Sequence, residues 1–143
     1  MMIRCTFVFV VLAAACQAEE ACPWLNAATA GGVLGGGSVQ TQITPHACSF
    51  VSRHGELRIE VETMAATYPD RCSGAAEQLK AIGNEAAACA VESKDGRIAE
   101  QVAGGVRDQA FVITVSTDDR SVSRNLLRDR TRKVAEQVAG NLF

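Results

Sequence analysis

The chain has 143 residues, a length that suits one domain, and 48% of them are hydrophobic, which is enough to build a core. Aromatic residues make up only 5% of the chain, so aliphatic side chains must fill that core. The formal net charge of -2 excludes a dedicated nucleic-acid binder, and it excludes a protein held on anionic membranes by its own charge.

Residues 1–18 have the pattern of a secretory signal peptide. A single arginine precedes the apolar run at 5–15, CTFVFVVLAAA, which is too short to span a bilayer. The last three residues of the segment, CQA, place small side chains at alternate positions, as signal peptidases require. We expect cleavage after residue 18, one mature domain over residues 19–143, and a secreted or periplasmic bacterial protein.

A lipid anchor is the alternative for this N-terminus. The stretch LAAAC at 12–16 resembles a lipobox, in which Cys16 would carry the lipid and become the first residue. Its leucine lies four residues before the cysteine, where three is usual. On this hypothesis the domain is anchored to the cell envelope, and the lipid on Cys16 is its membrane contact. Plain secretion, lipidation and an uncleaved anchor all remain open at this point.

Two disulfides are expected in the exported domain. Four cysteines lie beyond the signal peptide, and an even number in an exported chain indicates pairing: Cys22, Cys48, Cys72 and Cys89. None of them forms a C-x-x-C motif, which argues against zinc and thioredoxin-like sites. Three pairings are possible, and we favour Cys22–Cys48 with Cys72–Cys89, each stabilising the fold by about 3–4 kcal/mol on a loop-entropy estimate.

The glycine-rich stretch at 31–37, GGVLGGG, marks the end of the first predicted helix. Asn26 is a good N-cap for a helix over 27–34, and Gly35 can adopt the left-handed conformation that ends it. Gly31 and Gly32 would let a neighbouring element approach the helix. A strand over 38–44 follows, so the order is helix then strand, opposite to a dinucleotide-binding fingerprint. We interpret the glycines as structural.

Residues 48–63, CSFVSRHGELRIEVET, predict a β-hairpin. A two-residue turn at His54-Gly55 would place Phe50 opposite Ile59. This arrangement puts the apolar side chains of 48, 50, 57, 59 and 61 on the core face, because cross-strand partners share a face. The charged residues Arg58, Glu60 and Glu62 then point to solvent.

The second half of the chain predicts a short helix, three strands and a long helix. The short helix is expected over 70–81, with Cys72, Ala76 and Leu79 on one face. The strands are expected over 86–93, 99–106 and 109–117. The last helix opens at Asp118-Asp119, and its buried stripe comprises Leu127, Thr131, Val134, Val138 and Leu142.

No group of residues predicts catalysis, metal binding or a cofactor. A catalytic histidine needs an orienting carboxylate and a nucleophile, and we interpret His46 and His54 as solvated loop residues. The spacing of His46 and Glu60 does not argue for a metal site. Arg124, Arg128 and their basic neighbours in the last helix alternate with acids, which indicates a solvated face rather than a partner surface.

The layout resembles a family of small exported actinobacterial lipoproteins that carry a domain of unknown function. The resemblance lies in Cys22-x-x-Leu25-Asn26 before a helix ending Leu34-Gly35-Gly36, in Cys48-Ser49-Phe50, and in Ile82-Gly83-Asn84-Glu85-Ala86. The chain departs from the family in its lipobox and in the added pair Cys72 and Cys89. The resemblance implies an exported α+β domain, with the PsbP/Mog1-like arrangement of a sheet and flanking helices, and it implies no catalytic residues.

We therefore predict an α+β domain with an antiparallel sheet of five or six strands and a helix at each end packed on it. Trp24, next to Cys22, is expected to pack on the first disulfide, with ligand stacking as the alternative. The predicted function is non-enzymatic binding of a small apolar ligand or an envelope protein. The alternatives are a small secreted enzyme or enzyme inhibitor, or a purely structural envelope protein.

Overall fold

The structure, a computed structural model, describes residues 20–63, 74–92 and 95–143. The elements in chain order are α1 (Ala27–Val33), β1 (Gln40–Thr44), β2 (Ala47–Val51), β3 (Gly55–Thr63), β4 (Glu77–Leu79), β5 (Glu85–Val91), β6 (Ile98–Val106), β7 (Gln109–Thr117) and α2 (Arg124–Leu142). The predicted signal peptide and Cys16 lie outside the described residues, so cleavage and lipidation stay predictions.

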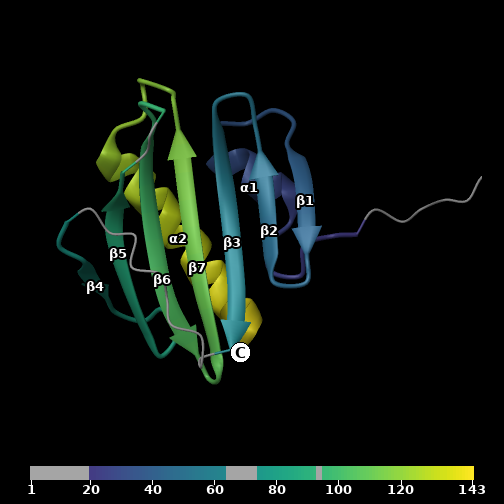
Figure 1. Cartoon of the computed structure of the whole chain (residues 1–143), viewed down its shortest axis with the longest axis vertical. Helices are drawn as coiled ribbons and strands as arrows, with labels where there is room; N and C mark the ends of the chain where they lie inside the picture. The colour runs from purple at the N-terminus through teal and green to yellow at the C-terminus, as the bar shows by residue number, and fades with distance from the viewer. Residues whose placement is uncertain (1–19, 64–73, 93–94) are drawn as a thin grey trace, which may run out of the picture.

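The strands of the described chain form one antiparallel sheet in the order β1-β2-β3-β7-β6-β5-β4 (Figure 1). The prediction of an α+β fold is confirmed, and the sheet has one strand more than expected. Strands β1 to β3 form one meander and β4 to β7 form a second. The two meanders meet where β3 pairs with β7 along the full length of both strands.

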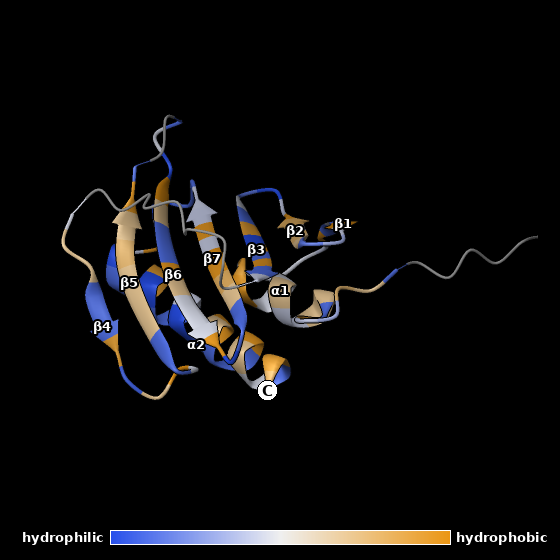
Figure 2. Cartoon of the chain, turned by 60° about the horizontal axis from the view of Figure 1, so that its bottom comes forward, coloured by the Kyte–Doolittle hydropathy of each residue, from blue (hydrophilic) through white to orange (hydrophobic). Residues whose placement is uncertain are grey.

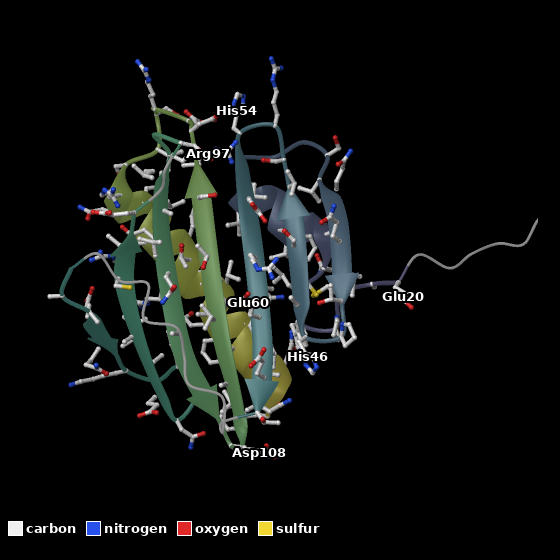
Figure 3. All side chains as sticks on the ribbon, viewed as in Figure 1. Glu20, His46, His54, Glu60, Arg97 and Asp108 are labelled. Carbon is white, nitrogen blue, oxygen red and sulfur yellow. A yellow bond between two sulfur atoms is a disulfide. The ribbon has the colours of Figure 1, made fainter. Side chains whose placement is uncertain are left out.

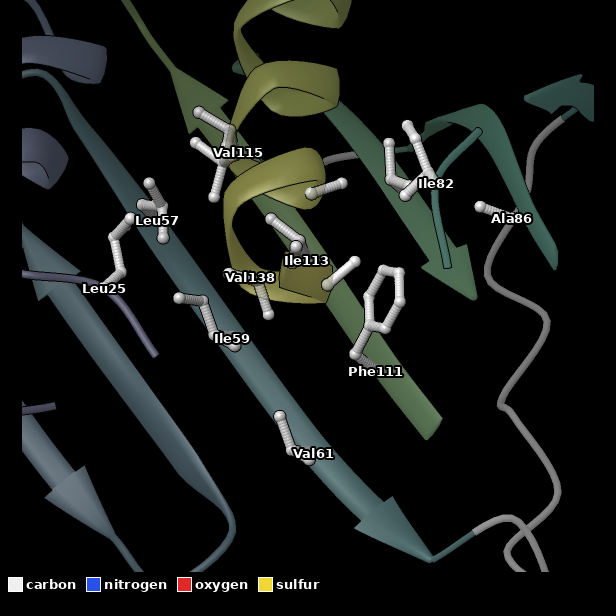
Figure 4. Packing of buried hydrophobic residues seen from close by; sticks show 14 of the residues in the cluster. Leu25, Leu57, Ile59, Val61, Ile82, Ala86, Phe111, Ile113, Val115 and Val138 are labelled. Atoms are coloured by element: carbon white, nitrogen blue, oxygen red, sulfur yellow. The ribbon is translucent and has the colours of Figure 1, made fainter. Parts of the chain in front are cut away.

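Both helices lie on the same side of the sheet, with α2 across β6 and β7 and α1 near β2 (Figures 1 and 2). Apolar and polar residues alternate along β3 and β7, visible as bands of colour in Figure 2. The apolar residues face α2, and Figure 4 shows Ile59, Phe111 and Ile113 beneath Val138 of that helix. Burial of this face against α2 is the main source of hydrophobic stabilisation.

Helix α1 is capped as the sequence predicts. The side chain of Asn26 accepts a hydrogen bond from the N–H of Thr29 (2.8 Å), and Gly35 follows the helix with a φ of 98°. A Cβ added to Gly31 would lie 3.2 Å from Gly37 O, so close packing at Gly31 is confirmed. Gly32 has nothing within 4 Å of that position, and the prediction of close packing there is wrong.

The predicted hairpin is present as β2 and β3, but its register is wrong by two residues. Phe50 pairs with Leu57 instead of Ile59. The reason lies at Gly55, which belongs to β3 rather than to the turn. A Cβ there would lie 2.4 Å from Ser116 O, so β7 needs a glycine at this point of the strand. Because the shift is an even number, every side chain keeps its predicted face.

Two other predicted elements differ in the structure. Glu77–Leu79 forms β4, where a helix was expected; pairing with β5 overrides helix propensity in this short stretch, and residues 64–73 lie outside the described chain. Helix α2 begins at Arg124 rather than at Asp118-Asp119, because the Ser123 side chain accepts from the N–H of Leu126 (3.1 Å) and caps the helix. The strand predicted over 99–106 is confirmed by β6.

The disulfide Cys22–Cys48 is present, with the two Cα atoms 6.0 Å apart. Cys89 is buried in β5 and is disulfide-bonded. Its expected partner, Cys72, lies outside the described residues, so that pairing stays a prediction. No helix among the described residues is long and apolar enough to cross a membrane. The Cys22–Cys48 bond agrees with an oxidising, extracytoplasmic location without establishing it.

Candidate functional site

The two histidines lie at opposite ends of the sheet (Figure 3). His46 is exposed in the turn between β1 and β2. His54 lies 3.1 Å from Asp118, measured from Nδ1 to Oδ1, and thus has the orienting carboxylate that the sequence did not reveal. The nearby hydroxyls point elsewhere, since Ser52 donates to Gly55 O and Ser121 donates to Asp119. Neither of these two hydroxyls is directed at the exposed His54–Asp118 pair.

Asp119 follows this pair in the loop before α2. The side chain and the backbone N–H of Ser121 both donate to Asp119 Oδ1, at 2.7 and 2.9 Å. These bonds hold the pKa of the Asp119 carboxyl below its usual value, and the positive charges of His54 and Arg130 act in the same direction. The loop thus keeps this carboxylate ionised and turned back on its own backbone.

Glu100 is a fully buried carboxylate beneath α2. Its Oε2 accepts from Arg128 Nε at 3.2 Å, and its Oε1 lies 3.7 Å from Arg124 Nη1. Arg128 also approaches Glu77 of β4, at 3.6 Å. The prediction of a solvated basic face is therefore wrong for Arg128, which is partly buried, whereas Arg124 is 52% exposed as expected. Glu100 lies two residues from Ile98 and from Val102 in β6 and so shares their face, and this spacing was the signal that could have placed it under the helix.

The described residues contain no group of three or more histidine, cysteine or acidic side chains that could hold a metal ion. The ion pairs on the buried Glu100 join α2 to β6, and the exposed pair of Arg128 with Glu77 joins α2 to β4. This cluster fixes the helix on the sheet.

A groove of about 850 Å³, which we call the N-terminal groove, lies between residues 20–27 and β1. Its volume falls within the ~300–1,000 Å³ range of ligand sites in proteins. The floor is apolar and comprises Val39, Ile43 and Phe50. The remaining walls are lined by Glu20, Ala21, Cys22, Asn26, Ala27, Gln40 and Thr41.

The Cys22–Cys48 disulfide builds this groove. It bonds the segment before α1 to β2, and the segment is thereby held across the helix-facing side of β1. Glu20, the charged residue among those that line the groove, lies beside the free side of β1 (Figure 3). Trp24 does not line the groove; it packs on the core, and its carbonyl accepts from Asn141 Nδ2 at 2.8 Å.

A second cavity of about 230 Å³ lies where the end of α1, the end of β7 and the first turns of α2 meet. Leu126, which is 41% exposed, lines this cavity. Arg130 and Val33 also line it, and the Arg130 guanidinium donates to Val33 O. The volume is below the ~300 Å³ at which ligand sites usually begin. The cavity has room for one side chain, and the N-terminal groove is the better candidate site.

No protein-family model matches the chain, and comparisons with curated proteins and with solved structures return no significant match. Sequence reasoning missed the groove because its walls come from three segments that the disulfide brings together. The local signal that could have pointed to it is the uncharged strand QTQIT, in which Ile43 lies among polar residues.

Proposed function

We propose that the protein is an exported, non-enzymatic binding domain whose N-terminal groove holds a segment of a partner protein of the cell envelope. The observation that carries this proposal is the position of the groove. It is large enough for several side chains, and it opens along β1, which has β2 as its one strand neighbour among the described residues.

The lining favours a polypeptide over a small apolar ligand. A lipid chain is best held by an enclosed and apolar cavity, whereas this groove is open and its polar side chains alternate with apolar ones. Gln40, Thr41 and Asn26 can hydrogen-bond to the peptide groups of a bound segment, while Val39 and Ile43, which are partly exposed, can contact its apolar side chains. Peptide-binding grooves combine these two kinds of contact.

The experiment selects displayed peptides of about ten residues, the length of a long strand, on the purified protein with its disulfides intact. Binding of the selected peptides is measured by fluorescence anisotropy with wild-type protein, Ala27→Trp and Ala28→Trp. Ala27 lines the groove and is exposed, so a tryptophan there fills the site without disturbing the core. Ala28 is an exposed neighbour outside the lining.

We expect Ala27→Trp to abolish peptide binding and Ala28→Trp to leave it unchanged. Peptides that bind all three proteins equally, or a selection that yields no binder, would overturn the proposed function. Selective binding of fatty acids in the groove, blocked by Ala27→Trp, would replace the protein partner with a small apolar ligand.

The second candidate function is hydrolysis with His54 as general base, and the His54–Asp118 pair favours it. The pair is about half exposed, and the neighbouring serine hydroxyls donate to other groups. The test is the hydrolysis of activated esters by wild-type protein, His54→Ala and Asp118→Asn. Activity lost in both variants would favour an enzyme over a binding domain.

A further inference from the structure

The hydrogen bonds of β2 determine which backbone groups of β1 face outward. Ser52 N–H donates to Gly55 O (2.9 Å), and Val61 N–H donates to His46 O (2.8 Å). In an antiparallel ladder, hydrogen-bonded pairs alternate with pairs that are not hydrogen-bonded. The even-numbered residues of β2 therefore bond to β3, and its odd-numbered residues bond to β1.

The odd-numbered residues of β2 pair with Gln40, Gln42 and Thr44. The peptide groups of those three residues thus face β2, and the N–H and C=O groups of Thr41 and Ile43 face away from the sheet. The side chains of Thr41 and Ile43 also line the N-terminal groove. The same two residues therefore offer hydrogen bonds to a neighbouring strand and contacts to the side chains of that strand.

Strand β1 lacks the features that protect a sheet edge. Its sequence, QTQIT, contains no charged residue and no proline, and the first proline follows the strand at Pro45. Edge strands in soluble proteins are usually short, charged or interrupted, because an open edge pairs with other chains. A regular, uncharged edge beside a groove is the arrangement that strand addition requires.

We propose that an extended segment of the partner protein adds to the free edge of β1 as a further strand, with alternate apolar side chains in the N-terminal groove. The segment carries a lysine or arginine that pairs with Glu20. This inference rests on the proposed function and names the conformation and chemistry of the bound partner.

The charges favour a different protein over a second copy of this chain. The groove contributes one acidic side chain, Glu20, and the chain has a net charge of -2. Two copies paired edge to edge through β1 would bring two acidic grooves together, which is unfavourable. A basic partner segment would instead neutralise Glu20.

The test uses the peptides selected on the wild-type protein, in two parts. The first part compares Thr41→Pro with Thr41→Val. Proline removes the outward N–H of Thr41 and is tolerated where an edge N–H faces solvent, whereas valine keeps the N–H and the size of the side chain. We expect Thr41→Pro to bind roughly tenfold or more weakly than Thr41→Val, because both variants lose the hydroxyl and only proline loses the N–H.

The second part leaves the protein unchanged, so it remains decisive even if Thr41→Pro fails to fold. Each peptide is N-methylated at every second residue, in one phase or the other. We expect one phase to abolish binding and the other to preserve it, because only alternate peptide groups face β1. In the complex, the amides of Thr41 and Ile43 should also become protected from hydrogen exchange.

The outcomes separate the two proposals. Peptides that Ala27→Trp blocks but that tolerate both N-methylation phases and Thr41→Pro would leave groove binding intact and overturn strand addition. Binding that Ala27→Trp does not affect would overturn the proposed function itself. A concentration-dependent dimer in sedimentation that Thr41→Pro abolishes would show a second copy on this edge and overturn the choice of partner.

Discussion

The two edges of the sheet are secured by different means. Strand β4 has three residues, and Glu77 within it reaches Arg128 of α2, which in turn binds the buried Glu100. Strand β1 has five uncharged residues and depends on its hairpin with β2, while the disulfide holds the segment beneath it. A charged, short edge repels added strands, whereas a disulfide placed below an edge stabilises it and leaves its backbone free. The two edges thus differ in where the stabilising contact lies, at the edge residue itself in β4 and beneath the strand in β1.

Removing the disulfide should have the largest effect on this comparison. We expect Cys22→Ala with Cys48→Ala to lower the free energy of unfolding by about 3–4 kcal/mol, since the bond closes a loop of intermediate length. Urea unfolding measures the loss. Hydrogen exchange should show the damage concentrated at α1 and β1, with the β4 edge unchanged. If hydrogen exchange increased equally at β1 and β4 in this variant, the two edges would not be stabilised separately.

The β4 edge should respond to the loss of its arginine. Arg128→Met keeps the apolar stem but leaves Glu100 buried with one distant cation, and we expect a loss of about 2 kcal/mol, below the usual 3–5 because Arg128 is partly solvated. Thermal unfolding measures this loss. Arg132→Met is the matched control, because its pair with Glu136 is exposed and should contribute at most about 0.5 kcal/mol.

Replacing Glu100 by an apolar residue in the Arg128→Met variant should restore part of that stability. An apolar pair of similar volume avoids the buried, unpaired charge. If Arg128→Met and Arg132→Met had equal effects, the Glu100 cluster would not be what secures the β4 edge.

The helix caps offer a smaller, paired comparison. Asn26→Ala and Ser123→Ala each remove a side chain that accepts an early helical N–H, and each should cost about 1 kcal/mol in urea unfolding. Asn26 also lines the groove and begins the helix that forms one of its walls. We therefore expect only Asn26→Ala to weaken the binding of selected peptides. A similar weakening by Ser123→Ala would point to a general loss of rigidity.

Local patterns in the sequence predicted those parts of the fold that depend on neighbouring residues. Asn26 capped its helix, Leu127, Thr131, Val134 and Val138 are buried in α2, and the β2–β3 faces were correct despite the register error. That error arose because the glycine at 55 is required by β7, which is distant in sequence. Strand β4 is too short to show a period, and only pairing with β5 reveals it.

The candidate site was not predictable in the same way. The groove exists because the Cys22–Cys48 bond places residues before α1 against a strand that follows it. The pairing itself was predicted, but the space that it encloses depends on side chains from three segments. Likewise, Glu100 and Arg128 are separated by the whole of β7, and each looks like a solvated residue until the helix is placed on the sheet.

A fall in pH should affect Asp119, which lies in the loop that joins β7 to α2. Hydrogen bonds from Ser121 lower the pKa of Asp119 in the folded protein, so the unfolded chain binds a proton at higher pH than the folded chain does. The resulting stabilisation is present above the unfolded value, about 3.9, and is lost as the pH falls through the folded pKa. Asp119 is exposed, so the effect on stability is small.

Carbon-13 NMR of the carboxyl groups should show Asp119 titrating below the usual aspartate range, and Ser121→Ala should move the pKa upward by removing the hydroxyl that donates to it. If Ser121→Ala left the titration of Asp119 in place, the lowered pKa would come from the backbone N–H of residue 121 and from the charges of His54 and Arg130. A loss of stability at low pH can be assigned to the β1 or the β4 edge only after the contribution of Asp119 is known.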